Sequence, residues 1–226
     1  MNSAAKAGGI ASLIQALCYI GGFAMLATAM SPGDAEGWSQ IQKLEFILER
    51  EGLFQLWNII IYVVFGIALV VLTVVLHRLL ERPGSLLMAI ATPFGLIWAG
   101  LVIASGMVAS VGLSEIAELF ARNPMEATSS WFIIGTVQDG LGGGVEIVGG
   151  LWVLLVSVSS LRSGVLLPKP VNLVGLVVGI AGIVTIVPAL SSLGAVFGLV
   201  QIIWFIAVGV VLLRADDAQQ CVAADV

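Results

Sequence analysis

The sequence predicts an all-α integral membrane protein with six transmembrane helices. Hydrophobic residues make up 59% of the 226 residues and charged residues only 10%, whereas a soluble domain carries about 25% charged residues. The apolar residues also gather into runs of about 20, the length that a helix needs to cross about 30 Å of hydrocarbon. Backbone polar groups in lipid must be hydrogen-bonded within their own segment, so each run is predicted to be a helix.

The apolar runs follow one another along one domain, residues 1–214. The predicted spans are residues 8–30, 53–76, 85–112, 131–160, 171–190 and 194–213. Residues 215–226 are polar and short, and we predict that they form a disordered cytoplasmic tail.

The distribution of basic residues predicts the orientation of the spans, because cytoplasmic segments carry an excess of Lys and Arg. With the N-terminus inside, the cytoplasmic segments hold Lys6, Arg78, Arg82, Arg162, Lys169 and Arg214. The outer loops then hold only Lys43, Arg50 and Arg122. The opposite orientation would reverse this bias, so both termini are predicted to be cytoplasmic.

Two outer loops have the pattern of short amphipathic helices. Residues 37–50 place apolar side chains at helical spacing, with Glu45 and Glu49 on the other side. Residues 114–122 repeat this pattern and stop at Asn123. Such segments are predicted to lie at the outer interface of the membrane.

The fourth predicted span carries two acids, Asp139 and Glu146. Seven residues separate them, so in a continuous helix they lie about 20° apart around the axis and about 10 Å apart along it. Gly142 and Gly150 share their face, while Trp152 falls on the opposite, bulky face. We therefore predict that the acids face the bundle interior and that Trp152 faces lipid.

Polar residues in two other spans lie at a similar depth. Asn58 in the second span and Gln201 in the sixth share the level of Asp139, about 10–12 Å below the outer ends of their helices. We predict a polar pocket in the outer half of the membrane, walled by spans two, four and six, with Glu146 as its floor. The candidate ligand-binding or proton-coupling residues are Glu146, Asp139, Asn58, Gln201, Gln55 and Tyr62.

Each candidate also has a structural interpretation. An acid at the centre of a membrane helix costs about 2.5–3.5 kcal/mol on insertion scales, which makes it a functional candidate. Asp139, however, can lie in the wet interface, and Glu146 can act as a hydrogen-bonding link between helices. For Asn58 and Gln201, hydrogen bonding between helices is favoured over ligand contact.

The sequence gives no support for catalysis, and we predict no catalytic residue, metal or cofactor. A nucleophile–base pair, a phosphate loop and metal-ligand spacing are all absent, so an enzyme has no positive support, although two acids in a cavity could do acid–base work. The net charge of −5 argues against nucleic-acid binding. The predicted partners are the lipid bilayer, a small ligand or cation, and a second copy or a partner membrane protein. Such a protein would dock on glycine pairs, namely Gly140/Gly144, Gly175/Gly179 and Gly194/Gly198.

Three stretches resemble a bacterial family of small six-helix membrane proteins of unknown function. They are GGGVEIVGGLWVLLVS at residues 142–157, LPKPVNLVGLVVGIAGIVTIVPAL at residues 167–190 and VFGLVQIIWFIAVGVVLLR at residues 196–214. The resemblance covers mainly residues 131–214 and includes Glu146 and Gln201. It implies six spans in a bacterial plasma (inner) membrane, and it implies no activity.

Two functional hypotheses follow. The first is binding or transport of a small ligand or cation through an outward-facing acidic pocket, coupled to protonation. The alternative is a non-catalytic scaffold or accessory subunit that binds a partner membrane protein. A pocket that reaches Glu146 favours the first, whereas a solid bundle with an exposed small-residue face favours the second.

Overall fold

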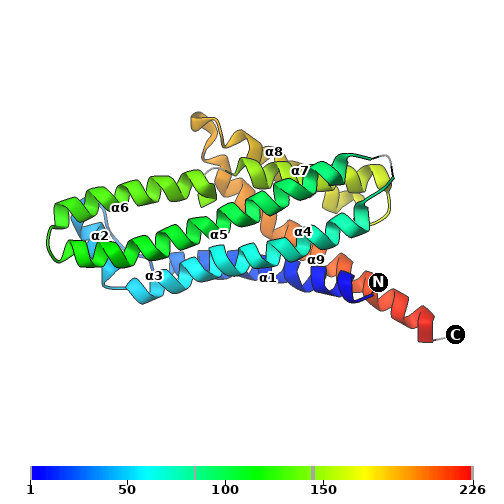
Figure 1. Cartoon of the computed structure of the whole chain (residues 1–226), viewed down its shortest axis with the longest axis horizontal. Coiled ribbons are helices and arrows are strands. Elements are labelled where there is room, and N and C mark those ends of the chain that lie inside the picture. Colours follow the sequence, from blue (N-terminus) through cyan, green and yellow to red (C-terminus); the bar gives the residue numbers. More distant parts are fainter. Residues whose placement is uncertain (1, 84, 144–145, 225–226) are drawn as a thin grey trace.

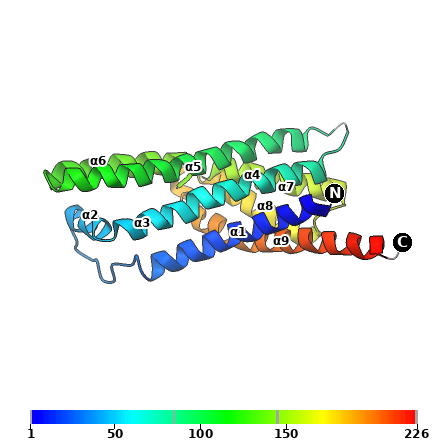
Figure 2. The ribbon, with the colours of Figure 1, turned by 60° about the horizontal axis from the view of Figure 1, so that its bottom comes forward.

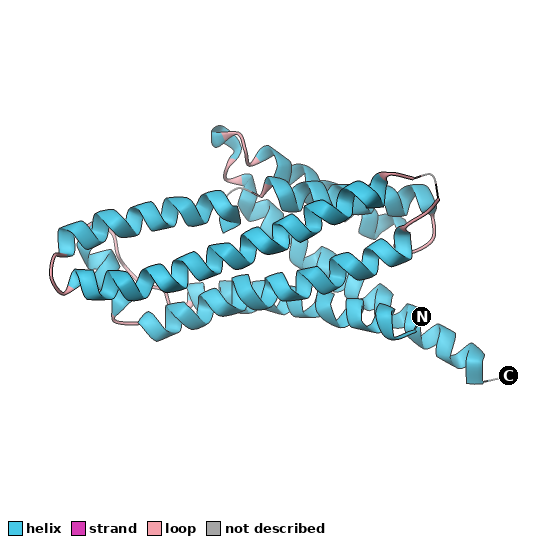
Figure 3. Cartoon of the chain, in the orientation of Figure 1, coloured by secondary structure: helices cyan, strands magenta, loops and turns pink. Residues whose placement is uncertain are grey.

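The computed structural model describes residues 2–83, 85–143 and 146–224, which form helices and connecting loops without a strand (Figure 3). The prediction of an all-α protein is confirmed for this part of the chain. The α-helices are α1 (Asn2–Ala27), α2 (Gln40–Leu48), α3 (Glu51–Asn58), α4 (Phe65–Leu80), α5 (Leu87–Phe120), α6 (Pro124–Gln138), α7 (Ile147–Ser163), α8 (Lys169–Val184) and α9 (Leu193–Ala224). The other helical segments are the π-helices η1 (Ile59–Val64) and η2 (Asp139–Gly143) and the 3₁₀-helix η3 (Pro188–Leu190).

Several helices have the length and composition of membrane spans. Among the described residues, five helical stretches are long and apolar enough to cross a membrane: Ser3–Ala27, Glu51–Leu80, Leu87–Phe120, Pro124–Ser163 and Leu193–Ala215. The fifth predicted span, residues 171–190, corresponds to the shorter apolar helix α8. Helix α8 ends early because Pro188 disfavours the helical conformation of the residue before it and donates no backbone hydrogen bond. The chain thus has the apolar helices of an integral membrane protein.

The long helices lie side by side as an elongated bundle (Figures 1 and 2). Helix α1 packs between α4 and α9, α5 contacts α4, α6 and α7, and α8 packs against α7 and α9. Helix α1 begins and helix α9 ends at the same end of the bundle. The α5–α6 hairpin and α2 lie at the other end.

The fourth predicted span is interrupted rather than continuous. Gly142 has φ 121°, a backbone conformation that glycine adopts readily and other residues rarely do. Helix α7 then begins at Ile147, with Glu146 at its N-cap position. The helical phase of Asp139 therefore does not carry over to the residues after the break.

This interruption overturns the prediction that Trp152 faces lipid. Trp152 is 0% exposed, and its ring contacts Trp98 and Trp204 at centroid distances of 5.8 and 5.7 Å. The phase argument assumed one helix through Gly142 and so assigned the wrong faces. Trp152 belongs to an aromatic core between α5, α7 and α9.

The end of the bundle opposite the two termini carries one of the two predicted amphipathic helices as a separate element. Helix α2 begins with a capping box between Ser39 and Gln42, and Leu44 is buried against Ile116 and Ala127. The helix predicted within residues 37–50 is confirmed. Residues 114–120, in contrast, are the last turns of α5, because no Gly or Pro interrupts the helix between Gly112 and its end.

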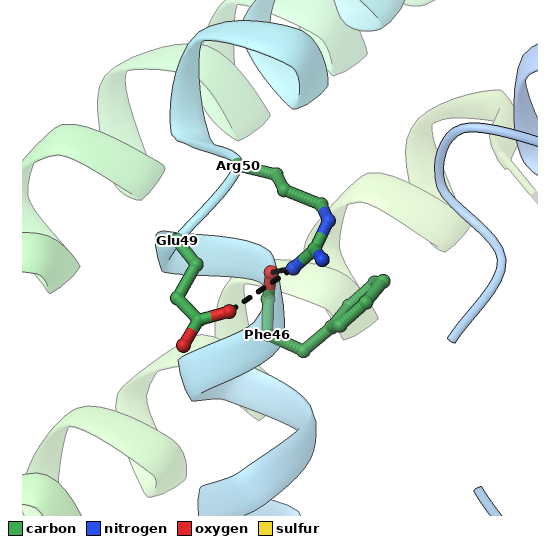
Figure 4. Close-up of polar contacts among 3 residues, drawn as sticks. All are labelled: Phe46, Glu49 and Arg50. Carbon is green, nitrogen blue, oxygen red and sulfur yellow. Dashed lines mark hydrogen bonds and ion pairs between the residues drawn. The ribbon is translucent and has the colours of Figure 1, made fainter. Parts of the chain in front are cut away.

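Arg50, which lies between α2 and α3, contacts the C-terminal end of α2 (Figure 4). Its Nη1 donates to the Phe46 carbonyl oxygen at 3.3 Å and to Glu49 Oε2 at 3.1 Å. The guanidinium carbon also lies 4.0 Å from the centroid of the Phe46 ring. Arg50 thus combines an ion pair with a cation–π contact at this end of α2.

Helix α9 continues to Ala224, so the structure has a helix over residues 215–224 where the sequence predicted a disordered tail. Residues 215–224, ADDAQQCVAA, contain no Gly or Pro and are rich in Ala and Gln, which favour helices. The last two residues of the tail and Gly144 of the first glycine pair lie outside the described residues.

Candidate functional site

A cavity of about 410 Å³, open on the side of the exposed residues Phe23 and Leu26, is lined in part by Glu146. Its lining comes from α1, α3, η1, α4, α5, η2, the N-cap of α7, the α8–α9 turn and α9. The lining residues are Tyr19, Gly22, Phe23, Leu26, Trp57, Ile61, Tyr62, Phe65, Trp98, Val102, Gly142, Glu146, Ser191, Gly194, Ala195, Phe197 and Gly198. This volume lies in the range of about 300–1,000 Å³ that is typical of small-molecule sites.

Glu146 is held at the cavity by the end of α8. Its backbone N–H donates to Thr185 Oγ1 at 2.9 Å, and that hydroxyl donates to the Gly182 carbonyl oxygen at 2.7 Å. Thr185 is buried. One threonine hydroxyl therefore joins the start of α7 to the last turn of α8 and fixes the backbone of the acid.

Thr185 gives a direct test of this junction. Replacing Thr185 by Val removes both hydrogen bonds at nearly constant volume and leaves the Glu146 N–H without its partner. A buried donor without a partner costs about 1–3 kcal/mol, so we expect the free energy of unfolding to fall by that amount. Titration with SDS in lipid bicelles measures it, and Thr185→Ser, which keeps the hydroxyl, is the control. Equal stability of Thr185→Val and the wild type would show that the hydroxyl does not hold Glu146.

Aromatic rings form most of the remaining wall. Seven lining residues are aromatic: Tyr19, Phe23, Trp57, Tyr62, Phe65, Trp98 and Phe197. Phe65 is packed edge-on between two of them, with its centroid 5.3 Å from Tyr19 and 5.5 Å from Trp98. Trp57 Nε1 donates to the Gly22 carbonyl oxygen at 3.0 Å. These contacts fix the orientation of the rings.

Two glycines of α9 keep the opposite wall open. A Cβ atom at Gly194 would meet only Thr185 Cγ2, at 3.9 Å, and one at Gly198 would meet Phe23 Cζ at 3.4 Å. Both are ordinary van der Waals distances. The backbone of α9 thus faces the cavity at these positions, and a larger side chain can enter it there.

Of the sequence-predicted candidates, the structure brings Glu146 and Tyr62 together in this cavity. Tyr62 lies in the π-helix η1. Asn58, at the end of α3, is buried outside the lining. Its Nδ2 donates to the Phe54 carbonyl oxygen at 3.0 Å, and its Oδ1 accepts from Gln138 Nε2 at 3.5 Å.

Asp139 requires a correction, because it does not face the bundle interior. It is exposed and lines a shallow groove between α2 and α6, beside Lys43 and Thr136. The physical reason is again the break at Gly142, which separates the face of Asp139 from that of Glu146. The predicted acidic pair is therefore not formed.

The two glutamine candidates lie outside the lining. Gln55 Nε2 donates to Glu51 Oε1 at 2.9 Å and to Ser114 Oγ at 3.0 Å, and the second of these hydrogen bonds links α3 to α5. Gln201 is completely buried one helical turn from Gly198. Its amide has no hydrogen-bond partner among the described residues. Neither side chain contributes to the cavity wall.

Several lining residues were missed by the sequence analysis, above all those of the first span. Gln15, Tyr19 and Gly22 follow each other at i, i+4 and i+7, which places them on one helical face. Tyr19 and Gly22 line the cavity, and Gln15 is completely buried one turn away from them. This spacing could have indicated that the first span belongs to the site. No comparable spacing in the sequence indicated that Trp57 and Trp98 belong to the site.

The lining of the cavity contains one carboxyl group, that of Glu146. Comparison with protein-family models finds no match, and neither do comparisons with curated proteins and with solved structures. The fold and the site define the chain as a helical membrane protein with a partly open, aromatic-lined cavity that includes one acid.

Proposed function

We propose that this protein binds a small molecule in the cavity around Glu146 and moves it across a bacterial plasma membrane. In this proposal the chain crosses the membrane six times, with α8 and the following turn as the fifth span and with both termini in the cytoplasm. The bias of Lys and Arg toward one end of the bundle supports this orientation. The resemblance of residues 131–214 to bacterial six-helix membrane proteins supports the membrane assigned.

The observation that carries the proposal is the cavity itself. Its lining includes Leu26 near the end of α1 and Ser191 in the α8–α9 turn. In the proposed orientation both lie at the outer ends of their spans, so the cavity belongs to the outer half of the bundle. Glu146 is the single carboxylate in the lining. It is therefore the group whose protonation would be coupled to movement of the ligand.

The packing of two of the three predicted glycine pairs, Gly175/Gly179 and Gly194/Gly198, favours this function over a scaffold role. A Cβ at Gly179 would contact Leu154 Cβ at 2.7 Å and the Gly150 carbonyl oxygen at 2.9 Å, so this glycine packs against α7. Gly194 and Gly198 line the cavity. These glycines serve close packing and the cavity within the chain, and a partner protein is not needed to explain them.

Filling the cavity tests the proposal. We expect native mass spectrometry of the protein, purified from its own membrane, to detect a retained small molecule. Gly194→Leu should lose this adduct, because the new side chain enters the cavity from a position where its Cβ meets only one contact, at 3.9 Å. Gly100→Leu is the matched control, since a Cβ there meets nothing within 4 Å and Gly100 lies outside the lining.

The two outcomes that would contradict the proposal are equally clear. One is wild-type protein that retains no small molecule. The other is an adduct that persists in Gly194→Leu at the wild-type level, which would place its site elsewhere on the protein.

A further inference from the structure

We propose that the ligand is an organic monocation, an ammonium group attached to an apolar or aromatic body. This inference rests on the proposed function, because it names the chemical class of the molecule bound in the same cavity. Three properties of the lining lead to it: its charge, its aromatic faces and its shortage of metal ligands.

The lining carries a negative charge whenever Glu146 is ionised. Glu146 is its one acid, and the lining contains no Lys, Arg or His. The N-terminus of α7 also lies here and carries about half a positive elementary charge. That partial charge is smaller than the full charge of a carboxylate at the same position, so the net attraction is for a cation. An anion would meet repulsion from Glu146 and no basic side chain.

The aromatic faces favour an organic cation. An ammonium group within about 6 Å of a ring centroid gains about 0.5–2 kcal/mol from the ring quadrupole, most when the site is desolvated. Trp57 and Trp98, the ring type that binds cations best, both line the cavity. The same protein already uses this contact at the end of α2, where the Arg50 guanidinium lies 4.0 Å from the Phe46 centroid.

The lining does not suit a hard metal ion. Such ions take six or more oxygen ligands, whereas the side-chain oxygens of this lining belong to Tyr19, Tyr62, Glu146 and Ser191. Nowhere in the described ranges do three His, Cys, Asp or Glu side chains form a group that could hold a metal. A neutral apolar ligand would fill the cavity but would leave the carboxyl of Glu146 without a partner, which is unfavourable.

The experiment compares three probes of similar size that differ in charge. They are benzyltrimethylammonium, its neutral carbon isostere neopentylbenzene, and benzenesulfonate. Binding is measured by equilibrium dialysis against the full chain in phosphatidylcholine nanodiscs, and binding to empty nanodiscs is subtracted. We expect the wild type to bind the cation at least about tenfold more tightly than the neutral isostere, because the carboxylate and the rings both act on its charge.

Variants test whether Glu146 and the cavity are responsible for binding of the cation. Glu146→Gln should weaken binding of the cation at least about tenfold, which corresponds to about 1.4 kcal/mol, and leave the neutral isostere unchanged. Glu115→Gln is the matched control, because Glu115 is an exposed acid at the outer end of α5, outside the lining. Gly194→Leu should abolish binding of the cation. The thermal unfolding of each variant is recorded first. If Glu146→Gln is unfolded, the inference is tested by the relative affinities of the wild type for the three probes.

The outcomes separate this inference from the proposed function. If no probe binds above the empty nanodiscs, or if Gly194→Leu binds as the wild type does, both fail. If the neutral isostere or the sulfonate binds at least as tightly as the cation, and Gly194→Leu removes that binding, the cavity is a ligand site and the cation inference alone is wrong. An unchanged affinity of folded Glu146→Gln for the cation would likewise show that the cation inference alone is wrong.

Discussion

Replacement of Trp152 by Ala is expected to lower the free energy of unfolding by about 3 kcal/mol, which is the lower end of the range for deleting a large buried aromatic side chain. Trp152 is completely buried and contacts Trp98 and Trp204, so its removal leaves a cavity between α5, α7 and α9. The lower end applies because lipid is as apolar as the core, so the loss comes mainly from packing and less from transfer out of water.

The matched control is Phe132→Ala, which removes an aromatic side chain that is 76% exposed. We expect a change of less than about 1 kcal/mol for it, since few packing contacts are lost. Unfolding of both variants by SDS in lipid bicelles measures the difference. If Trp152→Ala were as stable as Phe132→Ala, Trp152 would face lipid, as the continuous-helix phase predicts.

Replacement of Gly150 by Ala is expected to separate α7 from α8. The new Cβ would lie 2.7 Å from the Gly179 carbonyl oxygen and 2.7 Å from the Ile183 backbone nitrogen. Both are backbone atoms that cannot rotate away. Added volume in a packed core costs about 1–3 kcal/mol, and we expect the upper end of this range. Because Thr185 follows on the same helix, displacement of α8 should also weaken ligand binding at Glu146.

Gly100→Ala provides the comparison, since a Cβ there meets nothing within 4 Å. It should be at least as stable as the wild type, because Ala favours a helix over Gly by about 1 kcal/mol. SDS unfolding and dialysis with benzyltrimethylammonium are measured on both variants. Equal stability and equal binding in the two would contradict the close α7–α8 contact.

The sequence by itself determined the class of the protein and two members of the site, Glu146 and Tyr62. Hydrocarbon thickness fixes how many apolar residues a span needs, so the first, second, third and sixth spans were predictable from composition alone. The high free energy of an acid in an apolar segment likewise singled out Glu146. Both arguments depend only on residues close together in the chain and on the membrane, which is why they needed no knowledge of packing.

The tertiary structure alone decided which side chains meet Glu146. The break at Gly142, within the π-helix η2, resets the helical phase of the fourth predicted span, so the faces assigned to Asp139 and Trp152 from a regular helix were wrong. The aromatic wall brings Tyr19, Trp57 and Trp98 from three different spans to one cavity. Periodicity within a single segment contains no information on such contacts, because they depend on how the helices pack against one another.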